Sequence, residues 1–164
     1  MTLPEVALDI ARSFEGVREH GKNRGPHVDE FIRSVGLDPR DGAYPWCAAF
    51  VYFCLSRAAK AVGVPCPAKR TASVMSQFRF GCVHGYKVQH PAPGDVFLMD
   101  KGGGKGHCGF VESVCGTHLV TIEGNTDPDG GRDGDGVYRR LRRPEEVTLG
   151  FLRFVERPPE ETNA

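Results

Sequence analysis

The sequence predicts an α+β fold, with helices in the N-terminal half packed on an antiparallel sheet formed by the C-terminal half. Up to about residue 80, apolar residues recur at helical spacing. Beyond that point they alternate with polar residues in short runs separated by Gly, Pro and Asp. Helices followed by a succession of strands are typical of α+β domains. Since the 164 residues contain no repeat or low-complexity linker, we expect one domain, 1–164, with its core at about 26–156.

Four helices are expected in the first half of the chain. The third is apolar on nearly every side until Arg57, which predicts a buried helix. Two of these helices are expected to end at a glycine, the second at Gly36 and the third at Gly63. The expected ranges are 3–14, 26–35, 47–62 and 71–80.

Five strands are expected in the second half, because runs of alternating hydrophobicity there are bounded by turn residues. Sequential strands separated by short turns pair as an antiparallel sheet. The expected ranges are 95–100, 107–114, 118–126, 136–142 and 148–155.

Net charge gives no indication of a partner. Lysine plus arginine count 21 and aspartate plus glutamate count 21, so no field of one sign attracts nucleic acid or anionic lipid. The N-terminal segment MTLPEVALDIARSFEG mixes acidic, basic and apolar residues, unlike a secretory signal. No window approaches the ~20 apolar residues that span a bilayer. We expect a monomer made in the cytoplasm, without a visible signal peptide or a transmembrane segment.

The six cysteines are expected to be reduced, because the chain shows no export signal. None of them forms a CxxC pair, and the six histidines form no HxxxH pair, so the spacing does not predict a zinc site. No metal or other cofactor is expected.

Cys47, in the stretch YPWCAAF, lies at the predicted start of the buried helix. The residues before it supply no Ser, Thr, Asp or Asn to cap the first N–H groups of the helix. A thiol at this position has its pKa lowered by the helix dipole, and the same N–H groups can stabilise an oxyanion. The alternative is a packing residue, because free cysteine is among the most buried residue types.

Two aromatic residues beside Cys47 are candidate substrate-binding residues. Trp46 is the only tryptophan, and Tyr44 precedes it by two positions. An alternative for Trp46 is a structural role, as an anchor for the start of the helix.

A nucleophilic cysteine needs a base, and the base needs a group that orients it. His107 lies at the entrance of a predicted strand, within GKGHCGFVESV. The next strand, HLVTIEGNT, places Glu123 and Asn125 on one face. Taken singly, His107 has the alternative of a histidine bonded in a loop, and Glu123 that of an exposed strand carboxylate. Gly109, two residues after His107, would leave room for the helix to approach.

The turn between these two strands decides whether their side chains meet. A two-residue loop at 116–117 would turn Glu123 to the face opposite His107. A three-residue loop would set His107 opposite Asn125 and bring Glu123 to the same face. A catalytic arrangement therefore requires an odd-length loop or a β-bulge, which we predict here.

Together these motifs resemble the CHAP domains, cysteine- and histidine-dependent amidohydrolases and peptidases related to papain and to the NlpC/P60 enzymes. The similarity is carried by PWCAAFV, PAPGDVFLM, GHCGFVE and TIEGNT, and it covers residues 44–138. The resemblance implies a papain-like fold in which Cys47 is the nucleophile and His107 the base. It further implies that Glu123 orients the imidazole and that Asn125 supports the site or the oxyanion.

The resemblance also implies a function, hydrolysis of an amide bond in bacterial peptidoglycan. The bond is either the one between the glycan and its peptide, cut by an N-acetylmuramoyl-L-alanine amidase, or one within the peptides, cut by an endopeptidase. A lytic enzyme or an antibacterial effector fits, acting in the periplasm or cell wall after delivery, and an effector would have an immunity protein as partner. Two alternatives remain open: an idle module that binds wall peptides, and a papain-like enzyme acting on a protein amide.

Some members of this family bind calcium, and DPDGGRDGDG offers four carboxylates, Asp127, Asp129, Asp133 and Asp135. Their spacing departs from the EF-hand rule, because Arg132 stands where glycine is required and no glutamate ends the loop. We expect a solvated hairpin here and no calcium site. Of the other cysteines, Cys54 and Cys108 are expected to be packing residues, with Cys108 pointing away from His107.

Overall fold

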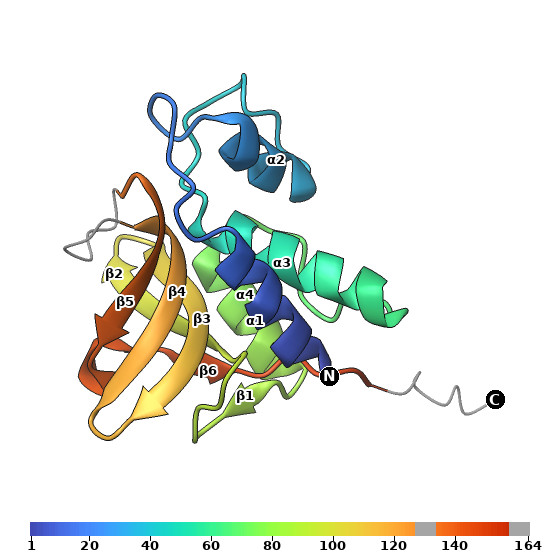
Figure 1. Cartoon of the computed structure of the whole chain (residues 1–164), viewed down its shortest axis with the longest axis vertical. Helices are drawn as coiled ribbons and strands as arrows, with labels where there is room; N and C mark the ends of the chain where they lie inside the picture. Colours follow the sequence, from blue (N-terminus) through green and yellow to red (C-terminus); the bar gives the residue numbers. More distant parts are fainter. Residues whose placement is uncertain (127–133, 158–164) are drawn as a thin grey trace.

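A computed structural model describes residues 1–126 and 134–157, and within them helices pack on a curved antiparallel sheet (Figure 1). This is an α+β fold consistent with the papain-like architecture. The helices are α1 (Leu3–Ser13), α2 (Pro26–Ser34), α3 (Cys47–Val62) and α4 (Val74–Val83). The strands are β1 (Lys87–Val88), β2 (Val96–Gly102), β3 (Lys105–Cys115), β4 (His118–Thr126), β5 (Gly136–Arg142) and β6 (Gly150–Leu152). A 3₁₀ turn, Pro144–Glu146, joins the last two strands.

Two helices begin at side-chain caps, α1 at Thr2 and α4 at Ser73. Thr2 and Glu5 form a capping box at the start of α1, in which the Thr2 N–H donates to the Glu5 carboxylate at 2.7 Å. α4 begins three residues later than expected because the hydroxyl of Ser73 accepts the N–H of Ser76 and so sets the first turn. α3 ends at Gly63, whose φ of 80° is the left-handed C-cap conformation.

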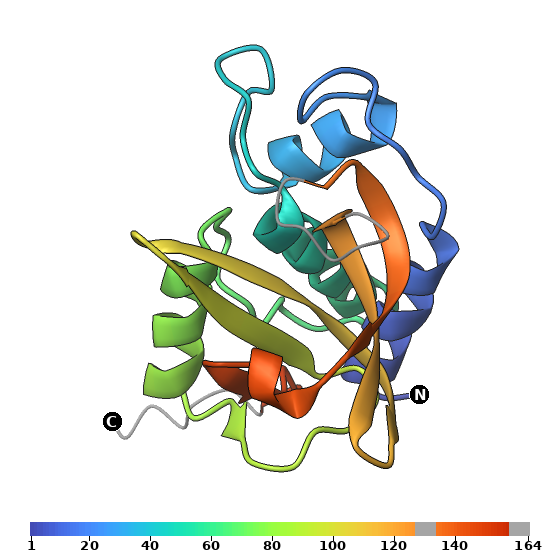
Figure 2. The ribbon, with the colours of Figure 1, turned by 90° about the vertical axis from the view of Figure 1, so that its left-hand side faces the viewer.

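The sheet has the strand order β1-β6-β2-β3-β4-β5, with every pair antiparallel. The four long strands β2, β3, β4 and β5 are consecutive neighbours, as the alternating runs predict. The short edge strand β1 is not among the expected strands, because two residues give no periodic signal. Figure 2 shows α4 beside the far end of the β2–β3 hairpin, away from β5.

The β3–β4 turn confirms the prediction of a bulge. The loop has two residues, and next to it Val114 pairs with Leu119. Further along, Val111 pairs with Thr121, so one extra residue, Glu112, lies in β3 between these pairs. The bulge changes the register by one residue, which reverses the face that each following side chain occupies.

α3 lies at the centre of the molecule, in contact with α1, α2, β3 and β4. An aromatic cluster joins its first half to the other helices, with Phe31 stacked on Trp46 at 5.7 Å between ring centroids and in edge contact with Phe50 at 5.1 Å. α1 adds four buried side chains to this core, from Leu3 to Ala11. The packed core therefore extends before residue 26, where the sequence analysis placed its start.

The close approach of α3 to the sheet depends on Gly124. A Cβ at this position would lie 2.8 Å from the Trp46 ring and 2.9 Å from the Phe50 ring. Gly109, to which the sequence analysis gave this role, instead makes room on the other face, where a Cβ would lie 2.9 Å from Cγ of Glu123. The reason is the strand alternation, because Gly109 shares the face of His107 and α3 covers the opposite face.

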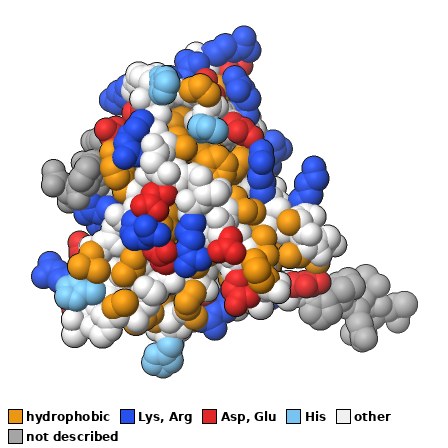
Figure 3. Space-filling model, viewed as in Figure 1, with side chains coloured by type: hydrophobic (Ala, Val, Ile, Leu, Met, Phe, Trp, Pro, Cys, Tyr) orange, Lys and Arg blue, Asp and Glu red, His pale blue; other side chains and the backbone are white. Residues whose placement is uncertain are grey.

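The surface carries no dominant sign of charge on the face seen in Figure 3, where acidic and basic side chains are interspersed. Among the described helices, none has the length and apolar character to cross a membrane.

Candidate active site

Cys47 is the first residue of α3, and its side chain is only 4% exposed. The N-cap residue, Trp46, makes no side-chain hydrogen bond to the helix, as the sequence predicts. The N–H groups of the first turn therefore point outward without a side-chain cap. The sulfur lies 4.0 Å from the carbonyl oxygen of Gly106, at the start of β3.

His107 lies on β3 beside this thiol, and the two side chains interact. The imidazole is 1% exposed. Its Nε2 is 2.7 Å from Oε1 of Glu123, whereas its Nδ1 has no hydrogen-bond partner in residues 1–126 and 134–157. Glu123 thus accepts the proton of Nε2, and this tautomer leaves Nδ1 as the nitrogen that takes the thiol proton.

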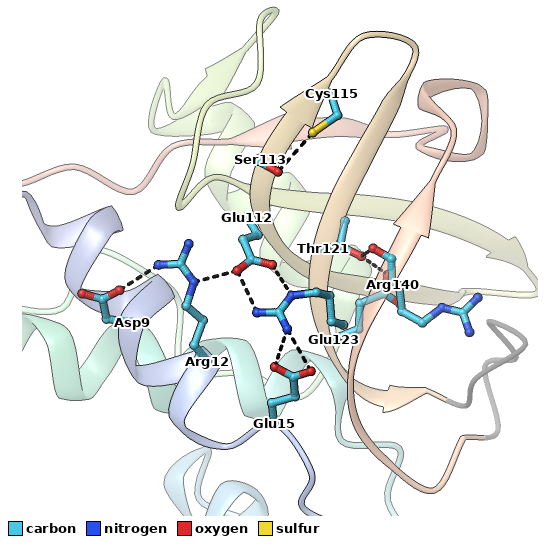
Figure 4. Close-up of polar contacts among 10 residues, drawn as sticks. Asp9, Arg12, Glu15, Glu112, Ser113, Cys115, Thr121, Glu123 and Arg140 are labelled. Atoms are coloured by element: carbon cyan, nitrogen blue, oxygen red, sulfur yellow. Dashed lines mark hydrogen bonds and ion pairs between the residues drawn. The ribbon is translucent and has the colours of Figure 1, made fainter.

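Glu123 is fully buried, and three neighbours hold its carboxylate. Besides His107, the hydroxyl of Thr121 donates to Oε2 at 2.6 Å, and Arg142 donates from Nε to Oε2 and from Nη2 to Oε1. Figure 4 shows Thr121 and Glu123 on β4. The bulge at Glu112 produces this arrangement, because it turns Glu123 to the face of His107.

The electrostatics favour a thiolate–imidazolium pair. Hydrogen bonds from Cys108 and His107, together with the positive charge of His107, lower the pKa of Cys47 well below its ordinary value despite burial. Burial alone would lower the pKa of His107, but its bonds to Cys47 and Glu123 raise it to about 9. Burial would likewise raise the pKa of Glu123, but Arg142 and His107 hold it well below its ordinary value. Both shifts favour the charged forms of the pair, the thiolate and the imidazolium.

Cys108 is part of the site, which sequence reasoning missed. It is buried in the helix-facing core, as expected of a packing residue, but its thiol also interacts with that of Cys47, and this interaction is the largest cause that lowers the pKa of Cys47. The same interaction and burial raise the pKa of Cys108. The only sequence signal is its place directly after His107. Burial also raises the pKa of Cys54, in agreement with a packing role.

A groove of about 470 Å³ opens on the thiol. Tyr44 and Pro45 lie along it beside Cys47, and the segment before α4 and the start of β3 form the rest. We call it the Cys47 groove; it is lined by Val35, Leu37, Tyr44, Pro45, Cys47, Arg70, Thr71, Ala72, Ser73, Val74, Gly104, Lys105 and Gly106.

The two aromatic candidates differ in position. Tyr44 is half-buried in the wall of the Cys47 groove, so it remains a candidate for contact with substrate. Trp46 has no exposed surface, and its indole N–H donates to Glu19 at 2.7 Å. Its predicted contact with substrate is therefore replaced by the structural alternative, an anchor for the start of α3.

Among the described contacts, Asn125 makes no hydrogen bond to Cys47, His107 or Glu123. A bulge at 124–125 interrupts the β4–β5 ladder, and Asn125 has a φ of 54°. Its Oδ1 is buried and has no hydrogen-bond partner within the described part of the chain. Its role in the site is still a prediction, which the sequence bases on strand alternation and the family resemblance.

The aspartates considered for calcium lie largely outside the described residues, which include only Asp135 of the four. Asp135 accepts a hydrogen bond from the hydroxyl of Tyr138. Within residues 1–126 and 134–157, no three His, Cys, Asp or Glu side chains form a group that could hold a metal ion.

A cysteine at a helix start, paired with a histidine on an antiparallel sheet whose ring is oriented by a carboxylate, defines the papain-like class of cysteine peptidases and amidases. Within this class the chain belongs to the CHAP domain family, whose model matches residues 39–125 and so includes Cys47, His107, Glu123 and Asn125.

Comparison with solved structures gives a similarity to the crystal structure of Ly7917, with a TM-score of 0.49 and 19% sequence identity. The match covers 96% of this chain and 63% of that one, so this chain spans less than two thirds of that protein's length. Comparison with curated proteins gives no match.

Proposed function

We propose that this chain is a peptidoglycan hydrolase that cleaves an amide bond with Cys47 as nucleophile. It acts as an N-acetylmuramoyl-L-alanine amidase or as an endopeptidase on the wall peptides, in the role of a lytic enzyme or an antibacterial effector. Its site of action is the periplasm or cell wall. The observation that carries the proposal is the buried Cys47–His107 pair at the base of an open groove.

The geometry supports a two-step acyl transfer. The Cys47 thiolate attacks the amide carbonyl, and the uncapped N–H groups of α3 stabilise the oxyanion. His107 then donates its proton to the nitrogen of the leaving amine as the C–N bond breaks. In the second step His107 takes a proton from water, whose oxygen attacks the thioester and releases the acid and the free thiol.

A digest of purified peptidoglycan tests this function. We expect soluble fragments from the wild-type protein and none from Cys47→Ala, with mass analysis of the fragments. A new amino terminus on an intact L-alanine peptide, with the lactyl acid left on the glycan, identifies an amidase, whereas cut peptides identify an endopeptidase. If walls of several peptide types release nothing while Cys47 reacts as an activated thiol, the substrate is a different amide. If Cys47 also reacts no faster than a model thiol, the chain is an idle binding module.

The charge of the Cys47 groove favours substrates that carry free carboxylates. Arg70 and Lys105 line it, and among the described residues its lining includes no Asp or Glu. The guanidinium of Arg70 is held in place by a 2.8 Å bond from Nε to the carbonyl of Ser34. Peptides of the wall carry carboxylates, so their recognition is expected to gain from these two charges.

Replacing both Arg70 and Lys105 with glutamine is therefore expected to raise KM for carboxylate-bearing wall peptides about five- to tenfold and to leave kcat nearly unchanged. The increase is this small because an exposed charge contributes ~1 kcal/mol or less to binding. The measurement is steady-state kinetics on soluble fragments. Lys101→Gln, on the same hairpin but outside the groove, is the control. An unchanged KM in the double variant would show that the groove does not select for anionic peptides.

A further inference from the structure

Arg142, the last residue of β5, is 3% exposed although it carries a permanent charge. Arginine is rarely this buried unless its charge is paired. Its partner is Glu123, which is also fully buried. This buried ion pair joins β4 to β5, and its carboxylate also bonds to the imidazole of His107.

The contact is a two-point fork. Nε of Arg142 donates to Oε2 of Glu123 at 2.8 Å, and Nη2 donates to Oε1 at 2.6 Å. The rigid, planar guanidinium fixes both the place and the plane of the carboxylate. Oε1 is the oxygen that also accepts the Nε2 proton of His107, so fixing the carboxylate fixes the imidazole.

Within residues 1–126 and 134–157, the charged groups bonded to this carboxylate come from the two neighbouring strands. His107 bonds to it from β3 and Arg142 from β5, while the neutral hydroxyl of Thr121 bonds to it from its own strand. Tyr138 and Arg140 of β5 lie opposite Glu123 and Thr121 and so share this face of the sheet. The charge of Glu123 also raises the pKa of the Cys108 thiol. On its outer side, Nη1 of Arg142 lies 3.6 Å from Glu146 of the 3₁₀ turn.

We propose that Arg142 is a positioning residue of the active site, whose guanidinium holds Glu123 as an oriented carboxylate and thereby keeps Nδ1 of His107 directed at Cys47. A buried carboxylate without this cation would take up a proton more readily and would be free to rotate. Either change weakens the stabilisation of the His107 imidazolium by Glu123. The Cys47 thiolate is then less stable as well, because it pairs with that imidazolium. The inference deepens the proposed hydrolase function, because the pair it serves is the proposed catalytic pair.

The test measures the alkylation of Cys47 by iodoacetamide between pH 4 and 10, followed for the Cys47 peptide by mass spectrometry. In Arg142→Gln we expect the rate at pH 6 to fall about tenfold, as for the loss of a hydrogen bond to a charged group, and the acid limb of the profile to move to higher pH. Arg142→Lys keeps the charge but loses the fork, so an intermediate rate is expected.

The matched control is Arg139→Gln, on the same strand. Arg139 also pairs with glutamates, at 2.6 Å to Glu112 and 2.9 Å to Glu15. Glu112 also bonds to Arg12 of α1, so these pairs lie on the helix-facing side (Figure 4). We expect its Cys47 profile to match the wild type. A folded Arg142→Gln with the wild-type profile overturns the proposal. If Arg142→Gln does not fold, Arg142→Lys decides, and a wild-type profile in that variant overturns it equally.

This readout needs no wall substrate, so its outcome is separate from that of the peptidoglycan digest. Shifted profiles with no released fragments would support the role of Arg142 and reject the substrate. Released fragments with unshifted alkylation profiles would support the substrate and reject the role of Arg142. Where the digest works, we expect Arg142→Gln to lower kcat and to leave KM nearly unchanged, because the residue does not line the Cys47 groove.

Discussion

Replacing His107 with alanine is expected to lower kcat at least about 10³-fold and to convert Cys47 into a slow thiol at neutral pH. In the wild type the imidazolium lowers the pKa of Cys47, whereas burial opposes ionisation. Without the ring, burial still opposes ionisation, and only the Cys108 thiol and the helix start favour the thiolate. The alkylation profile of Cys47 should therefore move to higher pH.

The pH dependence of kcat in the wild type follows from the same pair. The acid limb reports protonation of the Cys47 thiolate, which lies well below the ordinary thiol range. The alkaline limb reports loss of the proton that His107 must give to the leaving amine, and it is expected near pH 9. His118→Ala, a histidine that bonds to Thr117 at the hairpin loop, should leave both limbs in place. An unchanged rate of Cys47 alkylation at pH 6 in His107→Ala would contradict the ion pair.

Replacing Glu123 with glutamine is expected to lower kcat about 10²- to 10⁴-fold, the range found when a triad carboxylate is lost. The amide cannot balance the imidazolium, and it favours the wrong tautomer of His107. The same change removes the buried anion of Arg142 and leaves it only the more distant Glu146, which is expected to cost about 3–5 kcal/mol of unfolding free energy. Kinetics and urea unfolding at pH 7 measure the two effects.

The stability effect has a defined dependence on pH. The pKa of Glu123 is lower in the folded state than its ordinary value of 4.5, so its stabilising contribution is complete above that value and is lost as pH falls through the folded pKa. Glu123→Gln should lack this acid-dependent loss. Glu112→Gln, which breaks the more exposed pairs with Arg12 and Arg139, is the control and should cost about 1 kcal/mol or less. Equal losses in the two variants would contradict the buried network.

The elements of this fold follow from local signals. Helical periodicity and caps define α1 to α4, and alternation between turn residues defines the longer strands, because these patterns depend on neighbours in the sequence. The position of Cys47 at a helix start is local in the same way, since Pro45 and Trp46 leave the first turn uncapped. The requirement for a bulge also follows from counting residues across the hairpin, although its place in β3 does not.

Tertiary structure decided which side chains meet. The bulge at Glu112 brings Glu123 behind His107, and β5 brings Arg142 to the same carboxylate, a contact that no local pattern of the sequence predicts. The burial of Trp46 and the interaction of Cys108 with Cys47 likewise depend on how α3 packs against the sheet. By itself the sequence determined the helices and the longer strands, and it identified Cys47 and His107 as candidates for the catalytic pair. The contacts that Glu123, Arg142 and Cys108 make around this pair could be found only from the tertiary structure. Strand register and burial depend on contacts between distant segments of the chain, which local periodicity does not encode.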